Sequence, residues 1–284
     1  MPQTDRHDIP LRDGRFTAYD HGAQLGGWEH HGQPVLYLSS LAATGAGAAI
    51  RGGVPLCWPW FGPGRDGRHT PGHGFGRVAD WRLVDRQEDP AGARLTWELT
   101  PEQVADLPGR ELWPHDFLAR CEVSVGDAAR VALTVTNTGS QPFDYEVALH
   151  SYLVVGDVGQ IVLTGLDGST WFDKVVGGVH RQDGDLRLDG ETDRIYHTAG
   201  PVEVHDPVLG RTLRVTGEGT TDTIVWNPGP EKGQDIGDMA PDDWRTMVCV
   251  ESGAVADNAI SLPPGARWTT ATTITMSTPM RGTR

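Results

Sequence analysis

The residues best suited to chemistry gather between Ile50 and Trp81, in the stretch IRGGVPLCWPWFGPGRDGRHTPGHGFGRVADW. Arg51 and Arg77 carry forked guanidinium groups that match sugar hydroxyls or phosphate oxygens. His73 can hold or share a proton near neutral pH. Together these residue types make the stretch a candidate site for binding an oxygen-rich ligand.

Aromatic residues and glycines in the same stretch would suit a binding site. Trp58, Trp60 and Phe61 offer flat apolar walls, and the glycines let the backbone bend sharply and approach a ligand closely. The competing interpretation is an ordered proline-rich loop that covers one end of a sheet, with its arginines solvated and its tryptophans packed. Long loops in compact domains are usually functional or disordered, and composition alone leaves both interpretations open.

Two further titratable residues lie in apolar segments. His150 stands inside VALHSYLVV, and Glu251 follows the apolar run of MVCVES. A buried imidazole or carboxylate must find a partner or a function, because burial of an unpaired polar group is costly. The alternatives are a satisfied core histidine and a glutamate exposed at a strand end. With His73, the two residues would supply a general acid and a general base.

The segments around these residues have the pattern of short strands separated by turns. Short strand patterns occupy residues 14–39, and the pattern of residues 81–99 predicts a β-hairpin. A short helix is predicted at 100–109, where Thr, Pro and Gln occupy capping positions. Three strands are predicted across 117–155, the last of them containing His150, and further strands follow through 159–276. The elements that position the candidate residues are therefore strands and their connecting loops.

The fold predicted from these segments is an all-β protein, a large antiparallel β-sandwich with one or two short helices. In one strand Val131, Leu133 and Val135 alternate with more polar residues, which indicates a sheet with one solvated face. No linker or internal repeat separates the 284 residues, so we expect a single domain over 1–284. Two stacked smaller β-domains are the alternative.

The composition of the chain restricts the classes of partner that it can bind. The net charge of −14 and the absence of a basic run argue against nucleic acid, so an anionic substrate must be met by local arginines. Three cysteines without CxxC spacing predict neither a disulfide framework nor a zinc site. The N-terminus lacks a signal-peptide pattern, and no apolar run is long enough to span a membrane. We therefore expect a cytoplasmic protein without a membrane partner. We also expect a monomer, although no sequence feature determines the oligomeric state.

The sequence contains no strong metal-binding or nucleotide-binding motif. His69 and His73 have the spacing of a helical metal pair, but the intervening Thr70-Pro71-Gly72 prevents a helix. The phosphate-binding glycine motifs of nucleotide enzymes and the nucleophile elbow of hydrolases are absent. The acidic segment at 233–244, GQDIGDMAPDDW, lacks the spacing of a calcium loop, and we interpret it as a solvated loop that enters a short helical turn.

Several of these segments together resemble one enzyme family. In order and approximate spacing, they match the glucose-6-phosphate 1-epimerases, or hexose-6-phosphate mutarotases, over about 22–276. The matching motifs are IRGGVPLCWPWFGP, PGHGFGR, ALHSYL, TGLDGSTWFDK, ETDRIY, WNPGPEK and MVCVESG. The arginine of IRGG and the HGFGR block distinguish the chain from the free-sugar aldose 1-epimerases that it otherwise resembles. The resemblance implies a distorted β-sandwich of the galactose mutarotase type, and it implies no metal or organic cofactor.

The resemblance also implies roles for particular residues. The family's catalytic histidine falls at His150, and its catalytic glutamate falls at Glu251. Substrate contacts fall at four positions, namely Arg51, His73, Arg77 and Asp193. The chain departs from the family pattern at Gly72, at Gly76 and in the GQDIGDM segment, where the family carries a lysine-containing run. These departures concern the loop and one edge of the site.

The function predicted from this resemblance is interconversion of the α and β anomers of an aldohexose 6-phosphate. With ordinary pKa values, Glu251 would be the ionised base and His150 the protonated acid. A sugar-binding or sugar-sensing protein on the same scaffold is the first alternative, since fold does not decide function. A glycoside hydrolase is the second, and it would need another carboxylate opposite Glu251.

Overall fold

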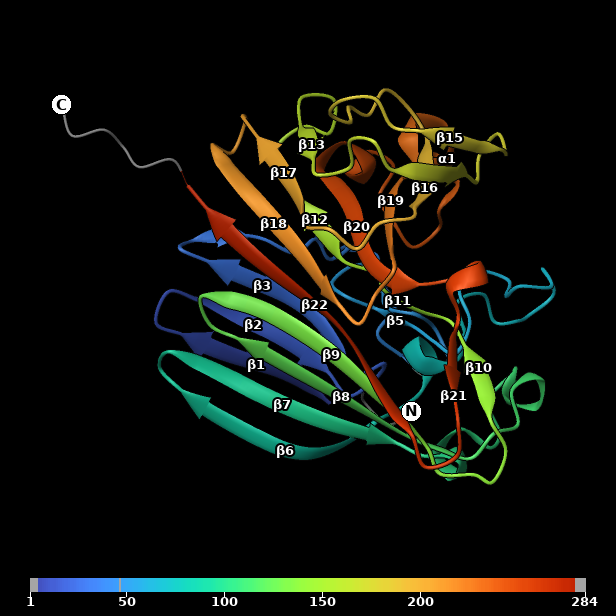
Figure 1. The fold of residues 1–284 in the computed structure, drawn as a ribbon. Helices are drawn as coiled ribbons and strands as arrows, with labels where there is room; N and C mark the ends of the chain where they lie inside the picture. Colours follow the sequence, from blue (N-terminus) through green and yellow to red (C-terminus); the bar gives the residue numbers. More distant parts are fainter. Residues whose placement is uncertain (1–4, 46, 279–284) are drawn as a thin grey trace.

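The computed structural model describes residues 5–45 and 47–278 and is built chiefly from antiparallel β-sheets. Two eight-stranded sheets form the body of the molecule, and two smaller sheets lie beside them (Figure 1). This architecture confirms the predicted all-β fold. Within the described residues, no helix is both long and apolar enough to cross a membrane.

The first large sheet, called here the long sheet, contains the longest strands of the molecule. Its strands in spatial order are β13 (Val162–Thr164), β17 (Val202–Asp206), β18 (Arg211–Glu218), β22 (Arg267–Ser277), β9 (Ala128–Asn137), β8 (Phe117–Val125), β7 (Gly92–Leu99) and β6 (Arg82–Asp89). The predicted hairpin at 81–99 is confirmed as β6 and β7. Val131, Leu133 and Val135 of β9 are buried, as their alternation indicates.

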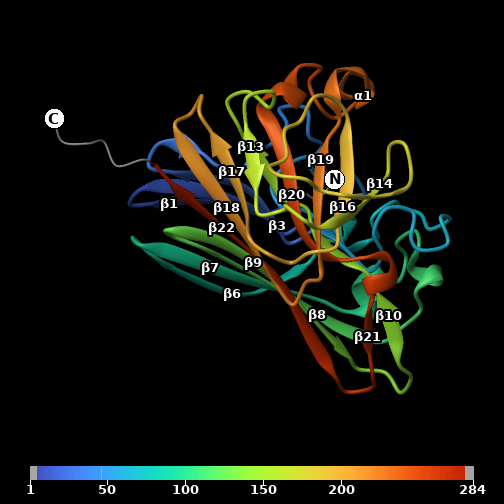
Figure 2. The ribbon, with the colours of Figure 1, turned by 45° about the horizontal axis from the view of Figure 1, so that its top comes forward.

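The second large sheet, called here the site sheet, is made of shorter strands. In spatial order these are β15 (Val179–Arg181), β14 (Thr170–Asp173), β16 (Thr192–Tyr196), β19 (Asp222–Asn227), β20 (Met247–Ala254), β11 (Val147–Leu149) and β5 (Leu56–Cys57), with β12 (Tyr152–Val154) also paired to β20. Figure 2 shows β14, β16, β19 and β20 grouped below α1. Short strands leave many chain ends and loops on this side of the molecule.

The remaining elements are small. A four-stranded sheet of β1 (Arg6–Leu11), β2 (Gly14–Tyr19), β3 (Gln24–His30) and β4 (Gln33–Pro34) lies beside the long sheet, and β10 (Phe143–Tyr145) pairs with β21 (Ile260–Leu262) (Figure 1). The described residues contain one α-helix, α1 (Gly229–Asp235), and five 3-10 turns, η1 (Gly76–Val78), η2 (Pro101–Val104), η3 (Arg110–Leu112), η4 (Asp243–Thr246) and η5 (Ala256–Asn258). The helix predicted after Thr100 is the 3-10 turn η2, with both bonds of its capping box formed.

A continuous apolar core joins the two large sheets. It contains Leu95 and Leu133 from the long sheet together with Leu149 and Val250 from the site sheet, each at most 1% exposed. Burial of this much apolar surface is the main stabilising contribution to folding. The core therefore fixes the strands that carry the candidate residues.

The structure differs from the sequence prediction at 143–155, where one strand was expected. The chain instead forms β10, β11 and β12, with a break at His150 and Ser151. The backbone N–H of His150 donates to the carbonyl of Pro55 (3.0 Å), and Tyr152 donates to the carbonyl of Gly53 (2.9 Å). Because the 53–57 segment takes these hydrogen bonds, regular alternation stops at His150.

Candidate active site

All six candidate residues line a single pocket of about 290 Å³, namely Arg51, His73, Arg77, His150, Asp193 and Glu251. The volume is near the lower end of the range typical of small-molecule sites, roughly 300–1,000 Å³. Three adjacent strands form its floor, because β16 pairs with β19 and β19 pairs with β20. Residues separated by more than 170 positions in the sequence therefore meet in one concave site.

The glycine-rich loop delivers His73 to this pocket through an unusual backbone conformation. His73 has a φ of 67°, a value that few residues other than glycine adopt. Its neighbour Gly74 also has positive φ, and a Cβ added there would lie 2.1 Å from the carbonyl oxygen of Trp58. The N–H of His73 donates to Gly62 (2.6 Å) and its carbonyl accepts from Trp58 (3.1 Å). The loop is thus an ordered part of the site.

The aromatic residues of this loop divide between the core and the site. Of the two interpretations left open by the sequence, the packed one holds for Trp58 and Trp60, which are 0% and 3% exposed and belong to the main core. Phe61 does line the pocket, with its ring 4.9 Å from that of His73. Trp226 of β19 supplies the second aromatic wall. The aromatic walls of the pocket are therefore Phe61 and Trp226, and both tryptophans of the loop pack in the core.

At the floor of the pocket, His150 and Glu251 contact each other. The Nε2 atom of His150 lies 3.3 Å from Oε1 of Glu251, and the two side chains are 9% and 1% exposed. The second ring nitrogen, Nδ1, and the second carboxyl oxygen, Oε2, are buried without a hydrogen-bond partner in the described residues. Buried polar atoms are nearly always paired. These two unpaired atoms therefore mark a place where a polar ligand fits.

The environment of this pair shifts both pKa values away from the ordinary values expected from sequence. Burial raises the pKa of Glu251 well above its usual range, and Asp193 acts in the same direction. Burial lowers the pKa of His150 well below its usual range, helped by His73, Arg77, Arg51 and Lys174. Desolvation disfavours the charged form of each group. Near neutral pH, burial therefore favours a neutral pair, with its proton on Glu251.

His73 is the third titratable group of the pocket. The backbone N–H of Gly62 donates to its Nδ1 (3.3 Å), which makes that nitrogen an acceptor and places the ring proton of the neutral form on Nε2. Its ring centroid is 6.0 Å from that of His150. Burial and then Arg77 lower the pKa of His73. This histidine is thus a neutral hydrogen-bond donor beside the pair.

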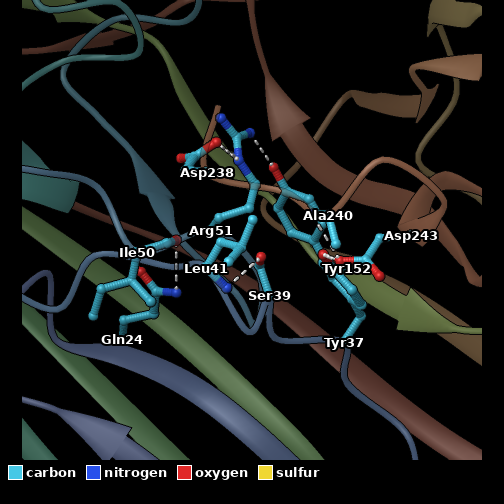
Figure 3. Close-up of polar contacts among 10 residues, drawn as sticks. All are labelled: Gln24, Tyr37, Ser39, Leu41, Ile50, Arg51, Tyr152, Asp238, Ala240 and Asp243. Atoms are coloured by element: carbon cyan, nitrogen blue, oxygen red, sulfur yellow. Dashed lines mark hydrogen bonds and ion pairs between the residues drawn. The ribbon is translucent and has the colours of Figure 1, made fainter. Parts of the chain in front are cut away.

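Arg51 is held by two partners at one side of the pocket (Figure 3). Its Nε donates to Oδ1 of Asp238 (3.0 Å), and its Nη1 donates to the hydroxyl of Tyr152 (2.9 Å). The ring of Tyr152 stacks on His150 with centroids 4.6 Å apart. Arg51 is therefore fixed beside the acid–base pair, with Nη2 free of these two contacts.

The acidic segment at 233–244 was expected to be a solvated loop, but two of its carboxylates bind other side chains. Besides Asp238, which binds Arg51, Asp243 accepts a hydrogen bond from the hydroxyl of Tyr37 (2.7 Å), and its Oδ2 also accepts from the N–H of Ala240 (3.1 Å) (Figure 3). Met239, between them, is buried. The segment that departs from the family pattern thus builds one edge of the site.

Arg77 differs from the other cations of the pocket. Its Nη2 donates to the carbonyl of Gly72 (2.8 Å), and its Nε is buried without a hydrogen-bond partner in the described residues. No carboxylate within the described part of the chain forms an ion pair with it. Its positive charge is therefore available to an anionic ligand.

Two lysines also line the pocket, and neither was a candidate from the sequence. The Nζ of Lys174 lies 3.0 Å from Oδ2 of Asp193 and 4.9 Å above the ring of Phe61. The Nζ of Lys232, on α1, lies 2.6 Å from Oε1 of Glu191. These are the only two lysines in the sequence. Their rarity beside the many arginines is a signal that could have found them.

Metal ligation is not supported by the side chains present. Among the residues that the structure describes, no group of three or more His, Cys, Asp or Glu side chains is arranged to hold a metal ion. His69 is instead bound to Asp66 (2.7 Å) outside the pocket. The chemistry of the site therefore depends on its proton-transfer groups and its cationic side chains.

The fold and the site together define a class of protein, a β-sandwich with a buried acid–base pair in a pocket surrounded by cations. The chain belongs to the aldose 1-epimerase family, whose family model matches residues 9–275. This match covers both large sheets except the last two residues of β22, and it covers every residue that lines the pocket.

Two curated relatives agree with this assignment. A protein of Salmonella typhimurium is 37% identical over 235 residues, which cover 81% of this chain and 76% of the relative. A protein of Cenchrus ciliaris is 31% identical over 261 residues, which cover 88% and 78%. Both are named "Putative glucose-6-phosphate 1-epimerase".

Solved structures support the same fold. A "putative mutarotase" from Salmonella typhimurium superposes with a TM-score of 0.87 at 33% identity, covering 98% of this chain and 92% of that one. A galactose mutarotase related enzyme from Lactobacillus acidophilus gives a TM-score of 0.72 at 12% identity, covering 99% of this chain and 100% of that one. The second similarity shows the fold alone and confirms the predicted galactose mutarotase type.

Proposed function

We propose that the protein interconverts the α and β anomers of an aldohexose 6-phosphate, with glucose 6-phosphate as its substrate. The observation that carries this proposal is the buried pair of His150 and Glu251, which shares its pocket with the unpaired Arg77. Family membership and the names of the curated relatives support the same reaction.

Anomer exchange requires two proton transfers at neighbouring oxygens. Opening the pyranose ring removes the proton of the C1 hydroxyl and adds a proton to the ring oxygen, while the C1–O5 bond breaks. Rotation about C1–C2 then presents the other face of the aldehyde, and closure reverses both transfers. A site for this reaction needs one base and one acid that exchange roles. The contacting imidazole and carboxylate meet this need.

In the proposed mechanism, the proton of the pair first moves from Glu251 to His150 across their contact. Ionised Glu251 then takes the proton of the C1 hydroxyl, and protonated His150 gives one to the ring oxygen. The open aldehyde then faces a neutral histidine and a protonated glutamate. During closure His150 takes the proton of the C5 hydroxyl, and Glu251 returns its proton to O1. Every proton is restored after one cycle. His73 donates from Nε2 to a sugar oxygen and orients the ring.

The phosphate is bound by the cations of the pocket. The protein carries a net charge of −14, so affinity for a dianion must come from short contacts with local donors. Arg77 has no carboxylate partner in the described residues, whereas Arg51, Lys174 and Lys232 each contact one. Arg77 therefore contributes most to phosphate binding, and Arg51 contributes less.

Saturation-transfer NMR on glucose 6-phosphate and glucose tests this proposal. We expect the wild-type protein to accelerate anomer exchange of the phosphorylated sugar. Arg77→Ala should lower kcat/KM for it by roughly ten- to 150-fold, because a charge-assisted hydrogen bond contributes about 1.5–3 kcal/mol. The loss on free glucose should be small, and Arg51→Ala should have the weaker effect of the two.

Three outcomes would contradict parts of this proposal. Sugar binding without faster exchange would favour the sugar-binding alternative, and release of product from an aryl glycoside would favour a hydrolase. Equal losses on both sugars in Arg77→Ala would assign that residue to ring positioning or folding. Arg65→Ala is the matched control, since Arg65 is exposed and outside this pocket.

A further inference from the structure

Gln24, the first residue of β3, lies outside the pocket but is bonded to the backbone on both sides of Arg51. Its Nε2 donates to the carbonyl of Gly52 (2.6 Å) and to that of Ile50 (3.2 Å), the second of which is drawn in Figure 3. The side chain is fully buried, and its Oε1 has no hydrogen-bond partner in the described residues. Two carbonyls need a donor, so the orientation of the amide is fixed. One side chain thus ties both carbonyls that flank Arg51.

The backbone at Arg51 needs this tie because two glycines follow it. Gly52 and Gly53 have φ values of 117° and 64°, and glycine adopts more backbone conformations than any other residue. A Cβ added to Gly52 would lie 2.4 Å from the carbonyl oxygen of Tyr37, so a stiffer residue does not fit there. The guanidinium of Arg51 is held at its far end by two partners. Gln24 holds the backbone from which that side chain starts.

His21 lies in the connection between β2 and β3 and contacts the segments of both phosphate-binding arginines. Its Nε2 donates to the carbonyl of Ala48 (2.7 Å), three residues before Arg51. Its Nδ1 donates to Oδ1 of Asp80 (2.8 Å), three residues after Arg77. The ring is fully buried. A single side chain outside the pocket therefore joins the two arginine-bearing segments.

The backbone of this connection is packed directly against the segment that carries Arg77. The N–H of Gly22 donates to the carbonyl of Ala79 (2.8 Å), and the N–H of Trp81 donates to that of Asp20 (3.0 Å). Gly22 has a φ of 71°, and a Cβ added there would lie 3.0 Å from the carbonyl oxygen of Arg77. The place of Arg77 in the fold thus depends on contacts with this connection.

We propose that residues 20–24 are a positioning element for phosphate recognition, in which Gln24 and His21 fix the two arginine segments relative to each other. This inference rests on the proposed function and deepens it, because it assigns phosphate selectivity to residues that do not touch the substrate. Donors that are already in place bind an anion more tightly, since less conformational freedom is lost on binding. The acid–base pair lies on other elements, so exchange of a sugar without phosphate depends much less on residues 20–24.

Gln24→Met tests the contact with Arg51, because methionine has a similar length and lacks both donors. The KM for glucose 6-phosphate should rise by roughly three- to tenfold, while kcat and the exchange of free glucose change by less than about twofold. A role in folding alone would lower the active fraction, and so lower kcat for both sugars without raising KM. If Gln24→Met does not fold, Gln24→Asn replaces it. This variant keeps the amide on a shorter side chain and should raise KM less.

Asn137→Leu is the matched control for the loss of a buried amide. Asn137 is fully buried, and its Nδ2 also donates to two backbone carbonyls, those of Gln141 (2.9 Å) and Leu262 (2.8 Å). None of these three residues lines the pocket. Asn137→Leu should lower stability and leave the KM for glucose 6-phosphate unchanged. Equal rises of KM for both sugars in Gln24→Met, or a rise in Asn137→Leu as well, would overturn the inference.

A double-mutant cycle tests whether Gln24 acts through Arg51. Gln24→Met should change the KM of the Arg51→Ala variant by less than about twofold, because the side chain that it positions is already absent. His21→Phe removes both donors of the ring and should still raise KM in the Arg51→Ala background, because it also releases the segment of Arg77. Additive effects of Gln24→Met and Arg51→Ala would overturn the inference. An unchanged KM in His21→Phe would do the same.

Calorimetric titration with inorganic phosphate measures binding without turnover, and so separates this inference from the proposed function. Affinity for phosphate should fall in Gln24→Met by about the factor by which KM rises, and Asn137→Leu should bind phosphate like the wild type. Absence of glucose 6-phosphate exchange by the wild-type protein would refute the proposed function, and the phosphate titration would still test the positioning role. Normal exchange with equal phosphate affinity in the wild type and Gln24→Met would refute only this inference.

Discussion

The two large sheets differ in regularity and in what they contain. The long sheet pairs β9 with β22 from Thr136 and Arg267 to Ala128 and Thr275 without interruption, and none of its strands contributes a residue to the pocket. The site sheet is built from strands as short as two residues, and β16, β19 and β20 each supply a pocket residue. The long sheet thus provides regular strand pairing, and the site sheet provides the residues of the pocket.

This difference has a physical basis. Long registered strands satisfy their backbone groups and alternate apolar with polar side chains, which stabilises the fold. A catalytic site instead needs side chains that leave the alternation and polar atoms that stay unpaired until a ligand arrives. His150, at the break between β11 and β12, has both properties. The comparison predicts that changes in the two sheets have opposite effects on activity and stability.

The largest expected effect is on activity in the site sheet. Glu251→Gln removes the proposed base and should reduce turnover of glucose 6-phosphate by roughly 10²–10⁴-fold, and His150→Asn should do the same. Because burial raises the pKa of Glu251, the acidic limb of the wild-type kcat/KM profile should lie above the usual glutamate range. Steady-state rates measured across pH check both statements. Turnover near the wild-type value in either variant would refute the assigned roles.

Glu251→Gln should also increase the stability of the fold, so activity and stability change in opposite directions in the site sheet. The folded-state pKa of Glu251 is raised, so the folded state binds more protons than the unfolded state between the two pKa values. Stability is therefore lost as the pH rises from the unfolded value through the folded one. Glu251→Gln removes this loss. Denaturant titration should show a more stable variant at about pH 8 than the wild type, with the difference gone below about pH 4.

In the long sheet the expected effect is on stability alone. Leu133 of β9 is 1% exposed and belongs to the main core. Leu133→Ala leaves a cavity there and should lower the free energy of unfolding by about 2–5 kcal/mol. Turnover per folded molecule should not change. Thr134→Ala, on the opposite face of the same strand, is the matched control, and a large fall in kcat for Leu133→Ala would break the separation between the sheets.

The sequence allowed the long sheet to be predicted better than the site sheet. The hairpin of β6 and β7 and the strands β8 and β9 follow from alternation and turn residues, which are local signals. The break at His150 depends on hydrogen bonds to Pro55 and Gly53, almost 100 positions earlier in the sequence. No local pattern contains that information.

Sequence motifs identified those pocket residues that lie within them. The motifs include Arg51, His73 and Arg77, and the structure places these residues in the pocket with the proposed acid–base pair. The contact between Arg51 and Asp238 joins residues 187 positions apart, so charge pairing there follows from tertiary structure. The pKa shifts of His150 and Glu251 likewise arise from burial, which the isolated motifs do not encode.

The smallest expected effect concerns the edge of the pocket, where Asp238 binds Arg51. Both side chains are partly exposed, at 34% and 24%, and such an ion pair contributes about 0.2–1 kcal/mol. Asp238→Asn keeps an oxygen that can accept from Nε of Arg51 but removes the charge that competes with phosphate. Tyr152 still holds Nη1 in place. The KM for glucose 6-phosphate should therefore fall by roughly two- to fivefold, with kcat and free glucose unaffected.

Asp242→Asn is the matched control for this prediction, because it removes the same charge from the same segment. Asp242 is 90% exposed and its carboxylate lies 3.7 Å from Arg245, so its influence on Arg51 is screened by solvent. If both variants lower KM equally, the effect is long-range charge and Asp238 has no special role. If Asp238→Asn instead raises KM, the carboxylate positions Arg51 for phosphate and does not compete with it. The sign of one small change thus decides whether this acidic segment opposes substrate or prepares the site for it.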